Sequence, residues 1–68
     1  MGKVTVKMLR AMKGWTQFEM AEKLEVCPAT YGRKEIGDSP FRVREIDKIL
    51  AIFNMKFEEI DWEAKKDG

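Results

Sequence analysis

Apolar residues recur at helical spacing along the chain, in stretches separated by polar and turn-forming residues. The clearest stripe has apolar residues at i, i+3, i+4 and i+7: Ile46, Ile49, Leu50 and Phe53. Shorter stripes are Val6, Leu9 and Met12, which follow one another at three-residue spacing, and Met20, Ala21 and Leu24, which share one face of a helix. No stretch of useful length alternates apolar and polar residues as a half-buried strand does. The pattern therefore predicts an all-α fold.

Capping residues set the bounds of the first two predicted helices. The first helix begins after Thr5 and ends at Gly14, because glycine readily adopts the left-handed conformation that closes a helix. Thr16 and Glu19 have the spacing of a capping box, in which each side chain accepts a hydrogen bond from the backbone N–H of the other residue. The second helix therefore begins at this pair.

Proline and turn residues set the bounds of the remaining helices. Pro28 suits the first position of a helix, so a third helix is expected over about residues 28 to 36. Residues 37 to 40, Gly-Asp-Ser-Pro, form a turn, and Asn54 is a left-handed stop for the fourth helix. Phe57, Ile60 and Trp62 predict a short fifth helix, followed by a tail over 63 to 68 that is expected to fray.

Size and composition predict one small cytosolic domain. With 68 residues, the chain has room for one compact core. Cys27 is the sole cysteine and cannot form an internal disulfide. No leader sequence and no run of about 20 apolar residues is present, so we expect a soluble, cytoplasmic protein with no membrane contact.

Charge is divided unevenly between the two halves of the chain, although the net charge is only +1. Residues 1 to 34 hold seven basic and three acidic residues, a net charge of +4. Residues 35 to 68 hold six basic and nine acidic residues, a net charge of −3. The basic half is therefore a candidate surface for nucleic-acid phosphates.

The segment from about residue 16 to residue 37 carries the functional signal. It contains a capped helix, a tight break and a second short helix. Helices joined this closely cross steeply, so one can brace against the DNA backbone while the other enters the major groove. Ala21 is small enough to allow their close approach at the crossing.

The residues of this segment resemble the Cro/repressor family of helix-turn-helix proteins, also described as xenobiotic-response-element-like regulators. The matching positions are Thr16-Gln17, Met20-Ala21, Leu24, Val26, Thr30 and Glu35-x-Gly37. The resemblance implies a compact five-helix bundle of the lambda-repressor-like DNA-binding type over about residues 6 to 62. It also implies a homodimer on double-stranded DNA, for which Ile52, Phe57 and Trp62 are the candidate contact residues.

The resemblance also implies which residues contact DNA. Pro28 and Ala29 match base-reading positions, and Arg33, one turn later, can pair bidentately with guanine. Gln17 matches a phosphate-binding glutamine at the start of the bracing helix. The other candidates are a hydroxyl and further basic side chains, which would otherwise form a solvated face: Thr30, Lys34, Arg42 and Arg44.

Three positions depart from the family pattern. Glu25 replaces the usual glycine of the turn and would be strained in a left-handed conformation. Lys34 stands where an apolar residue normally packs. Gly32 lies in mid-helix, where glycine lowers helix propensity by about 1 kcal/mol relative to alanine.

Catalytic chemistry has little support in the sequence. The chain has no histidine, a single serine (Ser39), no glycine-rich phosphate loop and no cluster of metal ligands. We therefore expect a sequence-specific transcriptional regulator that is not an enzyme and uses no cofactor or metal. The alternative is a protein-interaction module of the same fold, which binds a partner repressor or a toxin.

Overall fold

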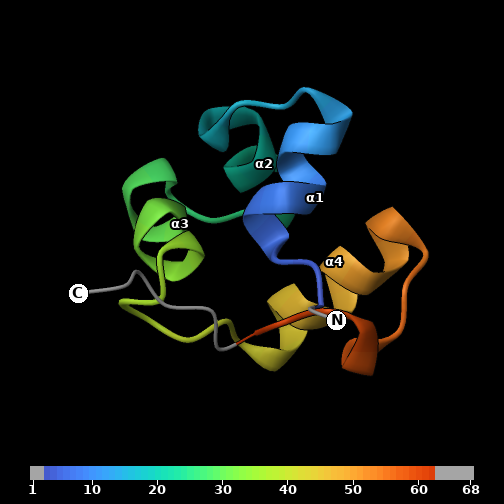
Figure 1. Cartoon of the computed structure of the whole chain (residues 1–68). Helices are drawn as coiled ribbons and strands as arrows, with labels where there is room; N and C mark the ends of the chain where they lie inside the picture. Colours follow the sequence, from blue (N-terminus) through green and yellow to red (C-terminus); the bar gives the residue numbers. More distant parts are fainter. Residues whose placement is uncertain (1–2, 63–68) are drawn as a thin grey trace.

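Four α-helices and one short 3-10 helix make up the part of the chain that the computed structural model describes, residues 3–62 (Figure 1). Their bounds are α1 Val6–Lys13, α2 Gln17–Leu24, α3 Pro28–Glu35, α4 Val43–Phe53 and η1 Phe57–Glu59. Figure 1 shows α3 at one side of the molecule and α4 at the other, with α1 and α2 between them. The tail predicted over 63 to 68 lies outside the described residues.

The first two helices begin where their caps predict. The Thr5 hydroxyl oxygen accepts a hydrogen bond from the Met8 N–H at 3.1 Å. The Thr16 hydroxyl accepts from the Glu19 N–H at 3.1 Å, and the Glu19 carboxylate accepts from the Thr16 N–H at 2.8 Å. The predicted capping box is therefore confirmed, because two N–H groups that lack a partner within the helix are satisfied reciprocally.

The four α-helices all end in a Schellman motif. A residue with positive φ follows α1, α2 and α4 directly and follows α3 after Ile36: Gly14, Glu25, Asn54 and Gly37. The next N–H then bonds back to a carbonyl five residues earlier, in Trp15 to Arg10, Val26 to Ala21, Asp38 to Arg33 and Met55 to Leu50. The stops predicted at Gly14 and Asn54 are confirmed, and Glu25 adopts the left-handed conformation despite its side chain.

One apolar cluster forms the core. Its buried members are Val6, Leu9, Met20, Ala21, Leu24, Tyr31, Ile49 and Ile60. The prediction that Met12 shares the buried face of the first helix is wrong, because its side chain is 77% exposed. Each step of three residues turns about 60° short of a full circle, so Met12 lies about 120° from Val6 around the helix.

Aromatic residues pack around this cluster. Trp15 lies partly buried against it, and its ring centroid is 5.7 Å from that of Phe53. The Lys23 ammonium lies 4.3 Å from the centroid of the Trp15 ring, which is cation–π geometry. Trp15 therefore packs against the core as a partly buried residue.

The predicted fifth helix is wrong in form. Only Phe57–Glu59 turn, as a single 3-10 helix. Ile60 is extended and forms an isolated parallel bridge with Val4, beside a hydrogen bond of 2.7 Å from the Asp61 N–H to the Val4 carbonyl. This pairing buries Ile60 and requires an extended backbone at that residue. The helical turn therefore ends at η1.

Among the described residues, the longest helix is α4, with 11 residues. None of these helices has the length and apolar character required to cross a membrane.

Candidate nucleic-acid interface

Helices α2 and α3 are joined by a short turn and pack against each other. Ala21 is fully buried on α2, and three residues of turn separate Leu24 from Pro28. The left-handed Glu25, at φ 61° and ψ 41°, reverses the chain within this turn. Val26 then packs against the core, so the turn is anchored from inside.

Helix α3 has one buried face and one exposed face. Tyr31 is fully buried and Lys34 is 8% exposed. The N-cap residue and the whole first turn are exposed, as is one later residue: Cys27, Pro28, Ala29, Thr30 and Arg33. The Cys27 side chain makes no capping hydrogen bond. The outer face of α3 is therefore available to a partner over most of its length.

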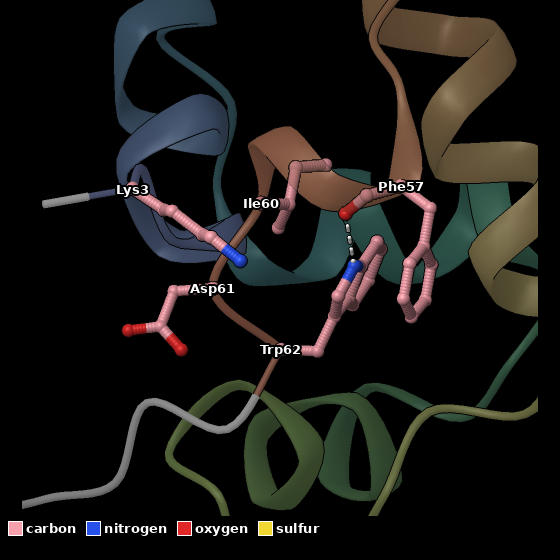
Figure 2. Close-up of a pocket in the computed structure, with 5 residues that line it drawn as sticks. All are labelled: Lys3, Phe57, Ile60, Asp61 and Trp62. Carbon is pink, nitrogen blue, oxygen red and sulfur yellow. Dashed lines mark hydrogen bonds between the residues drawn. The ribbon is translucent and has the colours of Figure 1, made fainter.

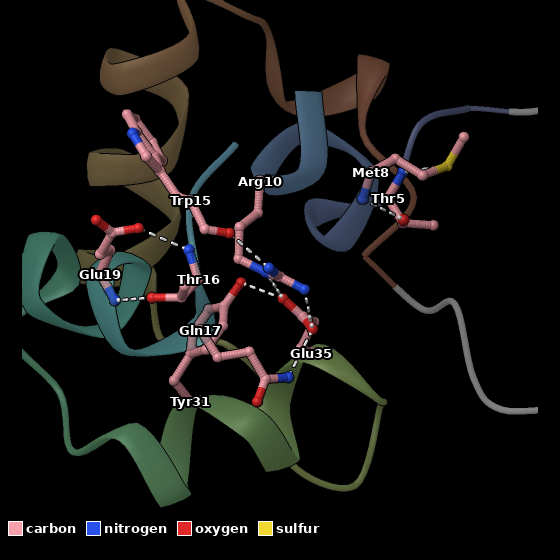
Figure 3. A network of polar contacts seen from close by, with 9 residues as sticks. All are labelled: Thr5, Met8, Arg10, Trp15, Thr16, Gln17, Glu19, Tyr31 and Glu35. Carbon is pink, nitrogen blue, oxygen red and sulfur yellow. Dashed lines mark hydrogen bonds and ion pairs between the residues drawn. The ribbon is translucent and has the colours of Figure 1, made fainter. Parts of the chain in front are cut away.

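The Glu35 carboxylate at the end of α3 joins three helices (Figure 3). The Arg10 guanidinium donates to both of its oxygens, at 2.7 and 3.2 Å. The Tyr31 hydroxyl donates at 2.5 Å and the Gln17 amide at 2.8 Å. Because the Glu35 side chain is only 1% exposed, this network fixes α3 relative to α1 and α2.

These contacts shift two pKa values in opposite directions. Burial alone would raise the pKa of Glu35, but its hydrogen bonds outweigh burial and hold the pKa below the ordinary value of 4.5. Burial, together with the hydrogen bond to Glu35, raises the pKa of Tyr31 far above 10.0. The network therefore consists of an ionised carboxylate and a neutral phenol across the neutral pH range.

Gln17, the predicted phosphate ligand, belongs to this network. One N–H of its amide is used by Glu35, and a primary amide has a second N–H. The residue is otherwise exposed at the first position of α2. Gln17 can therefore donate one hydrogen bond outward while Glu35 holds its orientation.

Lys34 does not lie on the exposed face of α3, although the sequence places it among the candidate DNA contacts. Its ammonium lies 2.7 and 2.6 Å from the two carboxylate oxygens of Glu45, and both side chains are 7% exposed. The reason is positional, since Lys34 lies on the inner side of α3 and its charge is neutralised by Glu45 of α4. The prediction that Lys34 contacts DNA is therefore corrected.

Glu45 is held ionised by this arrangement. Burial alone would raise the pKa of Glu45, but hydrogen bonds from the Arg42 N–H and the Lys34 ammonium outweigh burial and lower it below 4.5. The distance from the Arg42 nitrogen to the Glu45 carboxylate is 2.9 Å. Glu45 therefore caps the start of α4 while it pairs with Lys34.

The remaining charges near α3 are mostly positive. Glu35 and Glu45 are neutralised by their partners, so the exposed charges between residues 28 and 44 are Arg33, Arg42 and Arg44, with Asp38 as the single acid. None of the three arginines forms an ion pair among residues 3–62. This part of the surface can therefore attract phosphate more strongly than the net charge of +1 suggests.

The sequence reasoning missed the polar contacts that position these residues. The charge pattern gives Arg10 only as one of the basic residues and indicates no partner for Tyr31 or Glu45. The four-residue spacing of Tyr31 and Glu35 places both on one side of α3 and is the available signal for that pair. Arg10 lies 25 residues from Glu35, so local spacing gives no signal for their contact.

A separate hollow of about 310 Å³ lies where the two ends of the described chain meet (Figure 2). Its lining residues are Lys3, Phe57, Ile60, Asp61 and Trp62. The Trp62 indole N–H donates to the Phe57 carbonyl at 2.9 Å, and the two rings stack with centroids 5.5 Å apart. No group of histidine, cysteine or acidic residues able to hold a metal occurs within residues 3–62. The exposed face of α3 therefore remains the candidate site.

Comparisons with protein families, with curated proteins and with solved structures found no match to this chain.

Proposed function

We propose that the protein binds duplex DNA sequence-specifically and regulates transcription, with α3 in the major groove and α2 braced across the backbone. The observation that carries this proposal is the two-sided character of α3. Tyr31 and Lys34 hold its inner face, whereas its first turn and Arg33 are exposed. A short helix held in this way, behind a tight turn, suits entry into a groove about 12 Å wide.

Each exposed residue has a role that fits its chemistry. Arg33 pairs bidentately with guanine O6 and N7, and Pro28 and Ala29 contact a thymine methyl group. Thr30 and Gln17 donate hydrogen bonds to phosphates, which fix the orientation of the protein on the duplex. Arg42 and Arg44, at the start of α4, supply sequence-independent charge contacts.

The resemblance to the Cro/repressor family leads us to propose membership of that family, with the single 3-10 turn η1 in the place of the fifth helix. We further propose a homodimer that binds two half-sites about one helical turn apart in the cytoplasm of a bacterial or phage-infected cell. Of the three residues expected at the dimer contact, Phe57 is 53% exposed, and Ile52 and Trp62 are partly buried. Phe57 is therefore the residue that we expect to contribute most to the dimer contact.

The decisive experiment measures binding to a pool of randomised duplexes at two salt concentrations. We expect salt-dependent binding and selection of a sequence. Arg33→Ala should weaken binding to the selected site about 5-fold to 150-fold, equivalent to 1–3 kcal/mol, and relax discrimination at one base pair. Arg42→Ala should weaken binding to all sequences alike and make the negative slope of log K against log salt shallower by about 0.9.

Lys56→Ala is the matched control, because Lys56 is an exposed cation in the segment between α4 and η1, at the opposite side of the molecule from α3 (Figure 1). It removes the same charge as the arginine variants and should leave sequence preference unchanged. Wild-type protein that shows no salt-dependent binding to any duplex of the pool would refute the DNA-binding proposal.

A protein-interaction module of the same fold is the second candidate. It is favoured by Phe18, which is 58% exposed on α2, directly after Gln17. Exposed aromatic residues are enriched at protein interfaces. If no duplex binds, loss of a partner repressor or toxin from a pull-down with Phe18→Ser would support this alternative.

A further inference from the structure

The Lys34–Glu45 ion pair connects the base-reading helix with the start of α4. The two residues are 8% and 5% exposed, and both carboxylate oxygens lie within 2.7 Å of the ammonium. The contact spans 11 residues of sequence, across the loop between α3 and α4. The contact therefore fixes the geometry of the loop between α3 and α4. Exposed residues lie both before and after this loop.

One oxygen of Glu45 links this pair to the backbone of Arg42. Glu45 Oε1 accepts from the Lys34 ammonium at 2.7 Å and from the Arg42 N–H at 2.9 Å. The Arg42 side chain itself is exposed and forms no ion pair among the described residues. The backbone of Arg42 is thus fixed through Glu45 while its guanidinium stays available.

Stability alone gives no reason for a charged pair at this place. Apolar residues of similar volume commonly replace a buried ion pair without loss of stability, because removing two charges from water offsets their attraction. An apolar pair would also fill the space between α3 and α4, but it could not accept the Arg42 N–H. Packing between α3 and α4 therefore does not require the Glu45 carboxylate, whereas the hydrogen bond from the Arg42 N–H does.

We propose that Lys34 and Glu45 are positioning residues for DNA binding, which hold Arg42 in register with Arg33 so that one phosphate and one base are contacted together. This inference rests on the proposed function, because it assigns Arg42 and Arg33 to the two kinds of DNA contact. Neither Lys34 nor Glu45 touches the DNA. Their effect passes through the backbone of Arg42.

Two double variants separate positioning from stability. Lys34→Met with Glu45→Met removes the carboxylate but keeps an apolar filling, whereas Lys34→Met with Glu45→Gln keeps an oxygen that can accept from the Arg42 N–H. We expect both variants to melt at or above the wild-type temperature. In the Met/Met variant alone, the negative slope of log K against log salt should become shallower by about 0.9, and a further Arg42→Ala should change nothing.

Hydrogen exchange of the Arg42 amide in the absence of DNA provides a second readout. It should become at least tenfold faster in the Met/Met variant and remain protected in the Met/Gln variant. If the Met/Met protein does not fold, Lys34→Met with Glu45→Ala tests the same loss with a smaller side chain at position 45. Lys56→Ala again serves as the charge control.

Three outcomes would overturn the inference. One is a Met/Met variant that keeps the wild-type salt slope and Arg42 protection, and another is a Met/Gln variant that loses both. The third is wild-type protein that binds no duplex, which refutes the proposed function and this role with it. In that case the amide exchange still decides whether Glu45 orders the loop, so the two failures are distinguishable.

Discussion

Arg10 and Glu35 form a bidentate ion pair across 25 residues of sequence, with nitrogen–oxygen distances of 2.7 and 3.2 Å. The same guanidinium donates to the Trp15 carbonyl at 2.6 Å. One side chain of α1 therefore fixes both the end of α3 and the loop that leads into α2. Because Glu35 holds this guanidinium, loss of the Glu35 charge should disturb more elements of the fold than loss of any other single charge.

Glu35→Gln should lower the free energy of unfolding by about 3 kcal/mol, because it leaves the Arg10 charge, whose side chain is 15% exposed, without its partner. Urea unfolding would measure the change. Glu22→Gln is the control, since Glu22 is exposed on α2 and should shift stability by less than about 0.5 kcal/mol. Equal stability of the two variants would contradict the structural role of Glu35.

Stability should fall on acidification below about pH 4.5, the ordinary carboxyl pKa. The pKa values of Glu35 and Glu45 are lowered on folding, so the unfolded chain binds protons more tightly than the native state in this range. Their contribution is present above pH 4.5 and is lost as the pH falls through the native pKa values. Urea unfolding midpoints, measured between pH 2 and pH 7 at intervals of about one pH unit, test this linkage.

Alkaline conditions should destabilise the protein through Tyr31. Its pKa is raised on folding, so the contribution to stability is present below the ordinary value of 10.0 and is lost as the pH rises beyond it. Because Tyr31 is the single tyrosine of the chain, the ultraviolet absorbance of tyrosinate reports it directly. Tyrosinate should appear together with unfolding, and tyrosinate formation in the still-folded protein at pH 10 would contradict the prediction.

Glu25→Gly should give a more stable protein than Glu25→Ala, by about 1 kcal/mol. Both variants remove the ion pair with Lys48, whose distance is 3.0 Å and whose Glu25 side chain is 77% exposed. Only glycine also removes the steric cost of the left-handed conformation at φ 61°. Thermal melts of the two variants isolate that cost, and an alanine variant as stable as the glycine variant would rule it out.

Gly32→Ala should stabilise the protein by about 0.5–1 kcal/mol. A methyl group at this position would meet Gln17 Oε1 at 3.6 Å, which is ordinary van der Waals contact. Alanine has the higher helix propensity, so the gain comes without crowding. A lower melting temperature would show that the approach of α2 and α3 requires glycine here.

Local chemistry made the helix boundaries predictable. The hydroxyl of Thr16, the ring of Pro28 and the amide of Asn54 each act within a few residues of the chain, so their effects could be derived from spacing. The departure at Glu25 was also identified correctly as a strained position. The outer face of α3 was instead expected from the family resemblance, and residues 28 to 30 and Arg33 are exposed there.

Contacts between helices were not predictable in this way. Lys34 was grouped with exposed cations because neighbouring residues of the motif are basic, whereas its position around α3 directs it toward Glu45. Ile60 was assigned to a helix because of its spacing from Phe57, but its burial depends on a bridge to Val4 at the other end of the described chain. Both outcomes depend on tertiary neighbours that periodicity does not encode.

The attachment of α3 is concentrated in its second half. Tyr31, Lys34 and Glu35 connect it to the other helices, whereas residues 27 to 30 are all exposed. Substitutions in the first turn therefore leave the packing untouched. Residues 28 to 30 can therefore be exchanged at almost no cost to folding, and on the proposed function single changes there would alter the binding specificity.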